Sequence, residues 1–148
     1  MNDQSTNVHS KAPWHLWAVG IVALLWNCIG AFDYTMTESR NAAYLAPFNA
    51  EQLAYFTGLP TWVVATWALG VWGGVLGSLL LLLRQRGAVA AFAVSQVGMA
   101  VTFVHNYALS DGLRLMGNGA LVFSAVIFSV GTALLVYGVF MTKAQVLR

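Results

Sequence analysis

The chain has 148 residues, of which 59% are hydrophobic and only 8% are charged. A soluble domain usually carries about 25% charged residues, so this composition argues against a water-exposed globular protein and predicts an integral membrane protein. The net charge of +2 and the lack of a basic, aromatic-rich patch argue against a nucleic-acid partner.

A polar tail of residues 1–13 comes first, and four long apolar runs follow it. Each run has about 22 to 24 residues and a helix rises about 1.5 Å per residue, so each is long enough to cross a hydrocarbon core of about 30 Å. Because a helix satisfies its own backbone polar groups inside lipid, we expect an all-α transmembrane four-helix bundle. The predicted spans are residues 14–36, 60–83, 88–109 and 120–141, within one domain of residues 14–142 that precedes a cytoplasmic tail of residues 143–148.

The first connection, residues 37–59, is the longest. It contains Asn49 followed three residues later by Gln52, which is the pattern of a helix N-cap. This pattern predicts a short interfacial helix near residues 50–57, lying at the membrane surface, with an irregular loop as the alternative. Residues 110–119 are expected to form a short polar loop.

Basic residues are distributed unevenly over the ends of the spans. If the N-terminus is cytoplasmic, five of the seven basic residues lie on the cytoplasmic side: Lys11, Arg84, Arg86, Lys143 and Arg148. This bias follows the positive-inside rule and predicts an N-in, C-in orientation, with residues 37–59 on the periplasmic side. The tight turn of residues 84–87 predicts that the second and third spans form an antiparallel hairpin.

The second span carries a row of glycines: Gly70, Gly73, Gly74 and Gly77. Four-residue spacing places small residues on one helical face, where a neighbouring backbone can approach closely. Two readings stay open. The face either packs inside the chain's own bundle or forms the seam of a homo-oligomer.

Polar residues inside a membrane are costly, so each of them suggests a role. Asp33 lies about 27 Å from the cytoplasmic end of its span and His105 about 26 Å, with Tyr34 and Asn106 beside them. We therefore expect a polar cluster near the outer boundary of the bilayer, centred on Asp33 and His105. The cluster either ties two helices together or lines an outward-facing cavity that binds a ligand or handles a proton.

Three further residues lie deeper in the predicted spans. Asn27 of the first span is expected to hydrogen-bond Gln96 of the third span in a structural role. Cys28 is the single cysteine, so no intrachain disulfide is possible, and its apolar surroundings predict a buried thiol.

The residues that could carry chemistry are sparse. The three histidines, the single cysteine and the scattered acids make no metal-ligand pattern, and there is no nucleotide-binding loop or zinc-protease motif. His15 and His105 lie near opposite ends of the spans, which argues against a bis-histidine haem within one chain. We expect no catalytic residue, no metal and no cofactor, and we predict that the protein is not an enzyme.

The stretch from Trp26 to Thr37 reads W-N-x-x-G-x-x-D-Y-x-M-T, and residues 60–62 and 67–74 are also distinctive. Together they resemble a group of small, uncharacterised four-helix inner-membrane proteins of Gram-negative bacteria. The resemblance implies a multi-pass protein of the bacterial inner membrane and supplies no catalytic residue. It also suggests one shared structural or functional unit made of Asn27, Gly30, Asp33 and Tyr34.

Two functional hypotheses follow. The first is a non-enzymatic accessory or stabilising subunit that acts through a membrane-protein partner. The alternative is a small oligomeric transporter or channel with an outward-facing polar site around Asp33 and His105. Four helices enclose only a narrow path and no pair of broken helices is evident, which weakens the alternative. The expected partners are the lipid bilayer and either further copies of the chain or another membrane protein.

Overall fold

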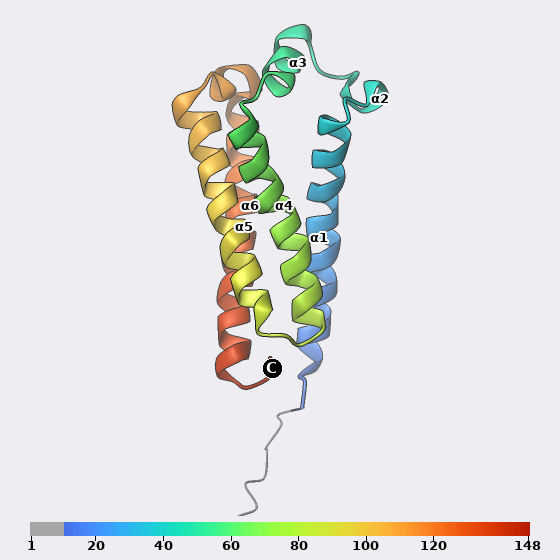
Figure 1. The fold of residues 1–148 in the computed structure, drawn as a ribbon, viewed down its shortest axis with the longest axis vertical. Helices are drawn as coiled ribbons and strands as arrows, with labels where there is room; N and C mark the ends of the chain where they lie inside the picture. Colours follow the sequence, from blue (N-terminus) through green and yellow to red (C-terminus); the bar gives the residue numbers. More distant parts are fainter. Residues whose placement is uncertain (1–10) are drawn as a thin grey trace, which may run out of the picture.

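The computed structural model describes residues 11–148, and this part of the chain is helical with no strand. Four long helices run side by side along the longest axis of the molecule (Figure 1). They are α1 (Trp14–Glu38), α4 (Thr61–Leu82), α5 (Gly87–Val104) and α6 (Gly112–Lys143), and a five-residue π-helix, η1 (His105–Leu109), continues α5. All four, with η1 counted as part of α5, are long and apolar enough to span a membrane, which confirms the all-α prediction with four apolar helices.

Two short helices, α2 (Ala42–Leu45) and α3 (Ala50–Thr57), connect α1 to α4. The predicted helix near residues 50–57 is confirmed as α3, and its N-terminus has the expected capping box. The Asn49 side chain accepts a hydrogen bond from the Gln52 N–H at 2.9 Å, and the Gln52 side chain accepts one from the Asn49 N–H at 3.1 Å. The position of α3 at a membrane surface stays a prediction. The sequence analysis missed α2, which is only one turn long.

The predicted loop of residues 110–119 is wrong, because α6 already begins at Gly112. The Leu115 N–H donates to the Asp111 carbonyl at 3.0 Å, which closes a first helical turn. At Gly117 the backbone leaves the helical conformation, with a φ of 74° and a ψ of 178°. Glycine adopts such a positive φ without a steric penalty, so α6 can kink at Gly117, between its first turn and the rest of the helix.

Helix α4 packs against both α1 and α5, while α6 packs mainly against α5. The glycine row of α4 makes this packing possible. A Cβ atom at Gly70 would meet Met99, one at Gly73 would meet Ser95 and one at Gly77 would meet Phe92, all on α5. The space above Gly74 is filled by Asn27 of α1. The chain's own helices therefore occupy this face, which supports the reading of a seam inside the bundle.

The predicted tail of residues 143–148 folds back against the bundle, and its cytoplasmic location stays a prediction. After α6 the backbone turns at Gln145, whose φ is 57°, and returns toward the turn between α4 and α5. Two backbone hydrogen bonds fix it there, from the Arg148 N–H to the Arg84 carbonyl at 2.7 Å and from the Arg86 N–H to the Arg148 carbonyl at 2.9 Å. Val146 and Leu147 are buried in the core, beside residues of the three other long helices: Leu16, Ala23, Leu81, Ala88 and Phe92.

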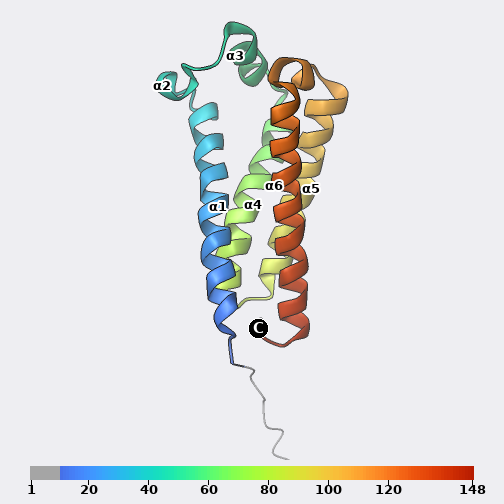
Figure 2. The same ribbon diagram turned by 180° about the vertical axis from the view of Figure 1, so that it is seen from behind.

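The start of α1, the turn between α4 and α5 and the chain end lie together at one end of the bundle, and α2 and α3 lie at the other (Figures 1 and 2). We call these the basic end and the α3 end, because the five basic residues assigned to the cytoplasmic side belong to the first of them. Residues 1–10 of the predicted tail lie outside the described residues. Cys28 is exposed on α1, so its predicted burial is wrong.

Candidate amphipathic groove

Two adjoining cavities lie between the long helices. The outer cavity, near the α3 end, has a volume of about 210 Å³, and the inner cavity has a volume of about 290 Å³. They share a ring of lining residues, which are Asp33, Trp67, Met99, Phe123 and Ile127. A third, apolar cavity of about 390 Å³ lies between α1 and α6 and shares Trp26 and Leu134 with the inner cavity. We call the three together the groove. Residues of α1 and α6 line all three cavities, and Figure 2 shows these two helices in front of α4 and α5.

Within residues 11–148, Asp33 is the only charged residue that lines the groove. Tyr44 of α2 folds back over the end of α1 and donates its hydroxyl to Asp33 Oδ1 at 2.5 Å. This hydrogen bond raises the pKa of Tyr44 to about 12, so the phenol stays protonated and remains a donor at neutral pH. Tyr44 also packs edge-on against Phe32, with ring centroids 5.7 Å apart. Tyr44 was not predicted as a site residue, because a helix of one turn has no sequence pattern that indicates its direction.

Neutral polar groups line the outer cavity opposite Asp33. Tyr55 of α3 donates its hydroxyl to Asn106 Oδ1 at 3.0 Å and lies 2.9 Å from Ser110 Oγ. Burial raises the pKa of Tyr55, so this hydroxyl also stays neutral. On the α6 side, Tyr107 Oη lies 2.8 Å from Ser124 Oγ. The α3 end of the groove is therefore rich in hydrogen-bonding groups, and Asp33 supplies its only charge.

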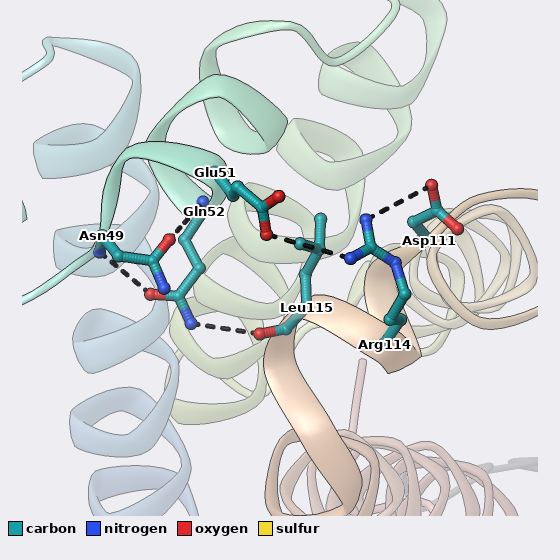
Figure 3. Close-up of polar contacts among 6 residues, drawn as sticks. All are labelled: Asn49, Glu51, Gln52, Asp111, Arg114 and Leu115. Carbon is teal, nitrogen blue, oxygen red and sulfur yellow. Dashed lines mark hydrogen bonds and ion pairs between the residues drawn. The ribbon is translucent and has the colours of Figure 1, made fainter.

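Polar contacts join α3 to the first turn of α6 (Figure 3). Gln52 Nε2 donates to the Leu115 carbonyl at 3.1 Å. The guanidinium of Arg114 lies 3.8 Å from both Glu51 and Asp111, and all three side chains are well exposed. Because Phe56 of α3 and Met116 of α6 both line the outer cavity, these contacts hold two parts of its wall together.

The predicted centre on Asp33 and His105 is not formed. His105 is 9% exposed and packs edge-on against Trp62, with ring centroids 5.3 Å apart. Its Nδ1 lies 3.2 Å from Asn106 Oδ1, it does not line the groove, and no ion pair joins it to Asp33 in the described part of the chain. The two residues lie beside different parts of α4, because His105 packs on Trp62 whereas Tyr34, the neighbour of Asp33, packs on Trp67. Helix α4 also packs between α1 and α5 and keeps the two residues apart. Of the predicted residues, Asp33 and Asn106 share the outer cavity.

Asn27 and Gln96 do not bond each other, which corrects the predicted pair. Asn27 Nδ2 donates to the Ala23 carbonyl at 2.8 Å and to Ser78 Oγ of α4 at 3.1 Å. Gln96 Nε2 instead donates to Thr132 Oγ1 of α6 at 2.7 Å. Both side chains line the inner cavity, so they supply polar groups to the same space from different helix pairs.

Tyr34 lies beside the groove and does not line it. Its ring packs edge-on against Trp67, with centroids 4.9 Å apart, and so supports the aromatic wall next to Asp33. Gly30, the fourth member of the unit suggested by the resemblance, lines the inner cavity. Among the described residues, no group of three His, Cys, Asp or Glu side chains could hold a metal ion.

Comparison with protein-family models, curated proteins and solved structures finds no match to this chain. The groove must therefore be interpreted from its own chemistry. It combines one carboxylate, several neutral donors and acceptors, and a long apolar wall. Such a surface can bind a molecule that has a polar end and an apolar body.

Proposed function

We propose that this chain is a multi-pass protein of the bacterial inner membrane that binds an amphipathic molecule in the groove and does no chemistry on it. The observation that carries the proposal is the gradient of polarity along the groove. Asp33, Tyr44 and Asn106 lie toward the α3 end, and the third cavity is lined entirely by apolar side chains. A lipid-like molecule has the same distribution of polar and apolar parts.

The groove is closed at the basic end. His15 Nδ1 of α1 lies 2.6 Å from Tyr137 Oη of α6, and this hydrogen bond joins the two helices that flank the groove. Val146 and Leu147 fill the core below it. A molecule shorter than the bundle can occupy the groove, whereas a transmembrane helix of full length would have to separate His15 from Tyr137.

The orientation of the protein determines from which leaflet of the bilayer a ligand can enter the groove. Arg84, Arg86 and Lys143 belong to the basic end, and the positive-inside rule assigns that end to the cytoplasm. The polar end of the groove then faces the periplasmic leaflet, where α3 lies at the membrane surface. This orientation favours a ligand taken from the outer half of the bilayer.

A non-enzymatic role is supported by the polar groups of the groove. Asp33 accepts a hydrogen bond from a phenol that stays protonated, and the hydroxyls of Tyr55 and Tyr107 bond neutral partners. None of these groups forms a pair of nucleophile and base. They are suited to holding a head group in place.

A role as an accessory subunit is the second candidate function. The exposed surface of α6 favours it. Of the residues of α6, only Gly112, Leu134 and Gly138 are buried. Its exposed apolar side chains include Val122, Val126 and Phe140. A membrane-protein partner that covers α6 would leave the groove unchanged, so the two candidates can be separated by experiment.

The test is native mass spectrometry of the protein purified in mild detergent. Ile127 lines both the outer and the inner cavity, so Ile127→Trp should fill the space that they share. Val126 is the neighbouring residue, is 45% exposed and lines neither cavity, which makes Val126→Trp the matched control. We expect a bound amphiphile on the wild type and on Val126→Trp, and none on Ile127→Trp.

Two results would overturn the proposal. Bound amphiphile that survives Ile127→Trp would place it outside the groove. A wild type that carries no amphiphile but retains a second protein at fixed stoichiometry would favour the accessory subunit, particularly if Val126→Trp released that protein.

A further inference from the structure

We infer that the groove selects an amphiphile whose head group is an ammonium cation, held by the Asp33 carboxylate against the Trp67 ring. The inference rests on the proposed function and adds the charge of the ligand to it. The first observation is an imbalance of charge in the lining of the groove. Three cavities adjoin along the groove, and the described residues that line them include one carboxylate and no lysine, arginine or histidine.

Asp33 has no cationic partner within the described residues. At the α3 end, Arg114 pairs with Glu51 and Asp111 instead. The one side chain that bonds Asp33 is Tyr44, through Oδ1, and a phenol does not neutralise the carboxylate. Asp33 is exposed toward the α3 end of the groove, so its carboxylate is accessible to a ligand head group. An ammonium group would supply both the opposite charge and hydrogen-bond donors for Oδ2.

The surroundings of Asp33 also suit an ammonium group. Trp67 lines both the outer and the inner cavity next to Asp33, and its ring is held edge-on by Tyr34. Cations bind over the face of an aromatic ring, most favourably over tryptophan. A phosphate or carboxylate head group would instead meet a like charge at Asp33, with no arginine or lysine in the groove to balance it.

The apolar part of the groove fits a tail that reaches well into the membrane. The third cavity extends along α1 as far as Ala18, which lies fifteen residues before Asp33. At about 1.5 Å per residue this distance is about 22 Å. A hydrocarbon core is about 30 Å thick, so a tail of one leaflet or slightly more can be accommodated.

The experiment compares three amphiphiles with the same brominated sixteen-carbon tail and a primary amine, an alcohol or a carboxylate as head group. The protein is held at pH 7 in nanodiscs of digalactosyldiacylglycerol, an uncharged lipid without an ammonium group, and bromine quenches nearby tryptophan fluorescence. Trp26 lines the inner and the third cavity. The quenching that disappears in Trp26→Phe therefore reports a tail in the groove, separate from amphiphile dissolved in the bilayer.

We expect the amine to bind about tenfold more tightly than the alcohol, with the carboxylate weakest. Asp33→Asn should abolish this preference, because asparagine still accepts the Tyr44 hydrogen bond but carries no charge. Glu38→Gln removes an exposed carboxylate from the same helix that does not line the groove, and it should leave the preference intact. Near-identical circular dichroism and gel filtration of all variants would show that folding is preserved.

The results separate the inference from the proposed function. Equal binding of the three amphiphiles would overturn the ammonium selectivity and leave the groove as a binding site. Tighter binding of the carboxylate would also overturn it. No site-specific quenching by any of them would refute the proposed function as well. If the amine binds as expected, displacement by added phosphatidylethanolamine would identify a membrane lipid as the source of the ammonium group, and lack of displacement would identify a free amphiphile.

Discussion

The two ends of the bundle contain the same four helices but are packed in different ways. At the basic end α1 and α6 are joined through His15 and Tyr137, and Val146 and Leu147 complete a buried core. At the α3 end the same two helices flank cavities, and α2 and α3 reach over them with polar side chains. The difference indicates that the basic end holds the helices together, which allows the α3 end to remain open.

Helix α4 connects the two ends, and its seam with α5 should be the most sensitive part of the molecule. A Cβ atom at Gly98 would lie 2.5 Å from the Thr66 carbonyl oxygen and 2.7 Å from the Gly70 nitrogen, which are backbone atoms of α4. Because backbone atoms cannot move aside as a side chain can, we expect Gly98→Ala to lower the free energy of unfolding by about 3 kcal/mol. Thermal unfolding in detergent would measure the loss.

Gly119→Ala is the matched control for this prediction. Gly119 also lies within a helix, but a Cβ atom there would meet nothing within 4 Å. Alanine has the higher helix propensity, so this variant should be unchanged or more stable by up to about 1 kcal/mol. Similar losses in both variants would mean that the α4–α5 seam has no special role.

The returning chain end should be the next most important element. Leu147 is 1% exposed, and Leu147→Ala would leave a cavity in the core of the basic end. We expect a loss of about 2 to 3 kcal/mol in the free energy of unfolding. Leu83→Ala, at a residue that is 66% exposed, should cost far less. If both variants unfold at the same temperature, the chain end does not contribute to the core in solution.

Tyr137→Phe tests the connection between α1 and α6 directly. The substitution removes the 2.6 Å hydrogen bond to His15 and keeps the aromatic ring, so we expect a loss of about 1 kcal/mol. Spin labels on α1 and α6 should report a broader distance distribution at the basic end. Tyr107→Phe removes a hydroxyl contact to Ser124 near the α3 end and should leave that distribution unchanged. A larger broadening of the distance distribution in Tyr107→Phe than in Tyr137→Phe would contradict the conclusion that the basic end holds the helices together.

The smallest effect is expected where α3 meets α6. Arg114 is exposed and lies 3.8 Å from each of two carboxylates, so Arg114→Ala should cost no more than about 0.5 kcal/mol, and less at high salt. Hydrogen exchange in α3 should rise slightly, with no change at the basic end. An effect of Arg114→Ala on global unfolding comparable to that of Leu147→Ala would contradict the proposed division between the two ends.

The sequence was sufficient to predict features that depend on length and local pattern. The four apolar helices follow from hydropathy, and α3 follows from the side chains of Asn49 and Gln52, which act within one turn. Counting residues along two spans predicted that Asp33 and His105 would meet. A count fixes neither the offset between two helices nor the direction of a side chain around the helix axis, and α4 separates the two residues.

The remaining site residues depend on contacts between distant segments. Tyr44 reaches Asp33 because α2 folds back over α1, and Asn27 meets Ser78 because Gly74 leaves room for it. Val146 and Leu147 were assigned to a tail because two apolar residues among charged ones give no periodic signal. In each case tertiary packing determines which residue a side chain contacts, and a single sequence gives no direct information about that packing.

The break at Gly117 would act as a depth marker if the chain spans a membrane as proposed. The backbone leaves the helical conformation there, and a Cβ atom at Gly117 would meet nothing within 4 Å, so the kink has open space beside it. Backbone groups that a kink releases from helical bonding need water or another partner, so we expect Gly117 at the level of the lipid head groups. Because Gln52 of α3 donates a hydrogen bond to the Leu115 carbonyl just before this residue, α3 is then expected in the same hydrated layer.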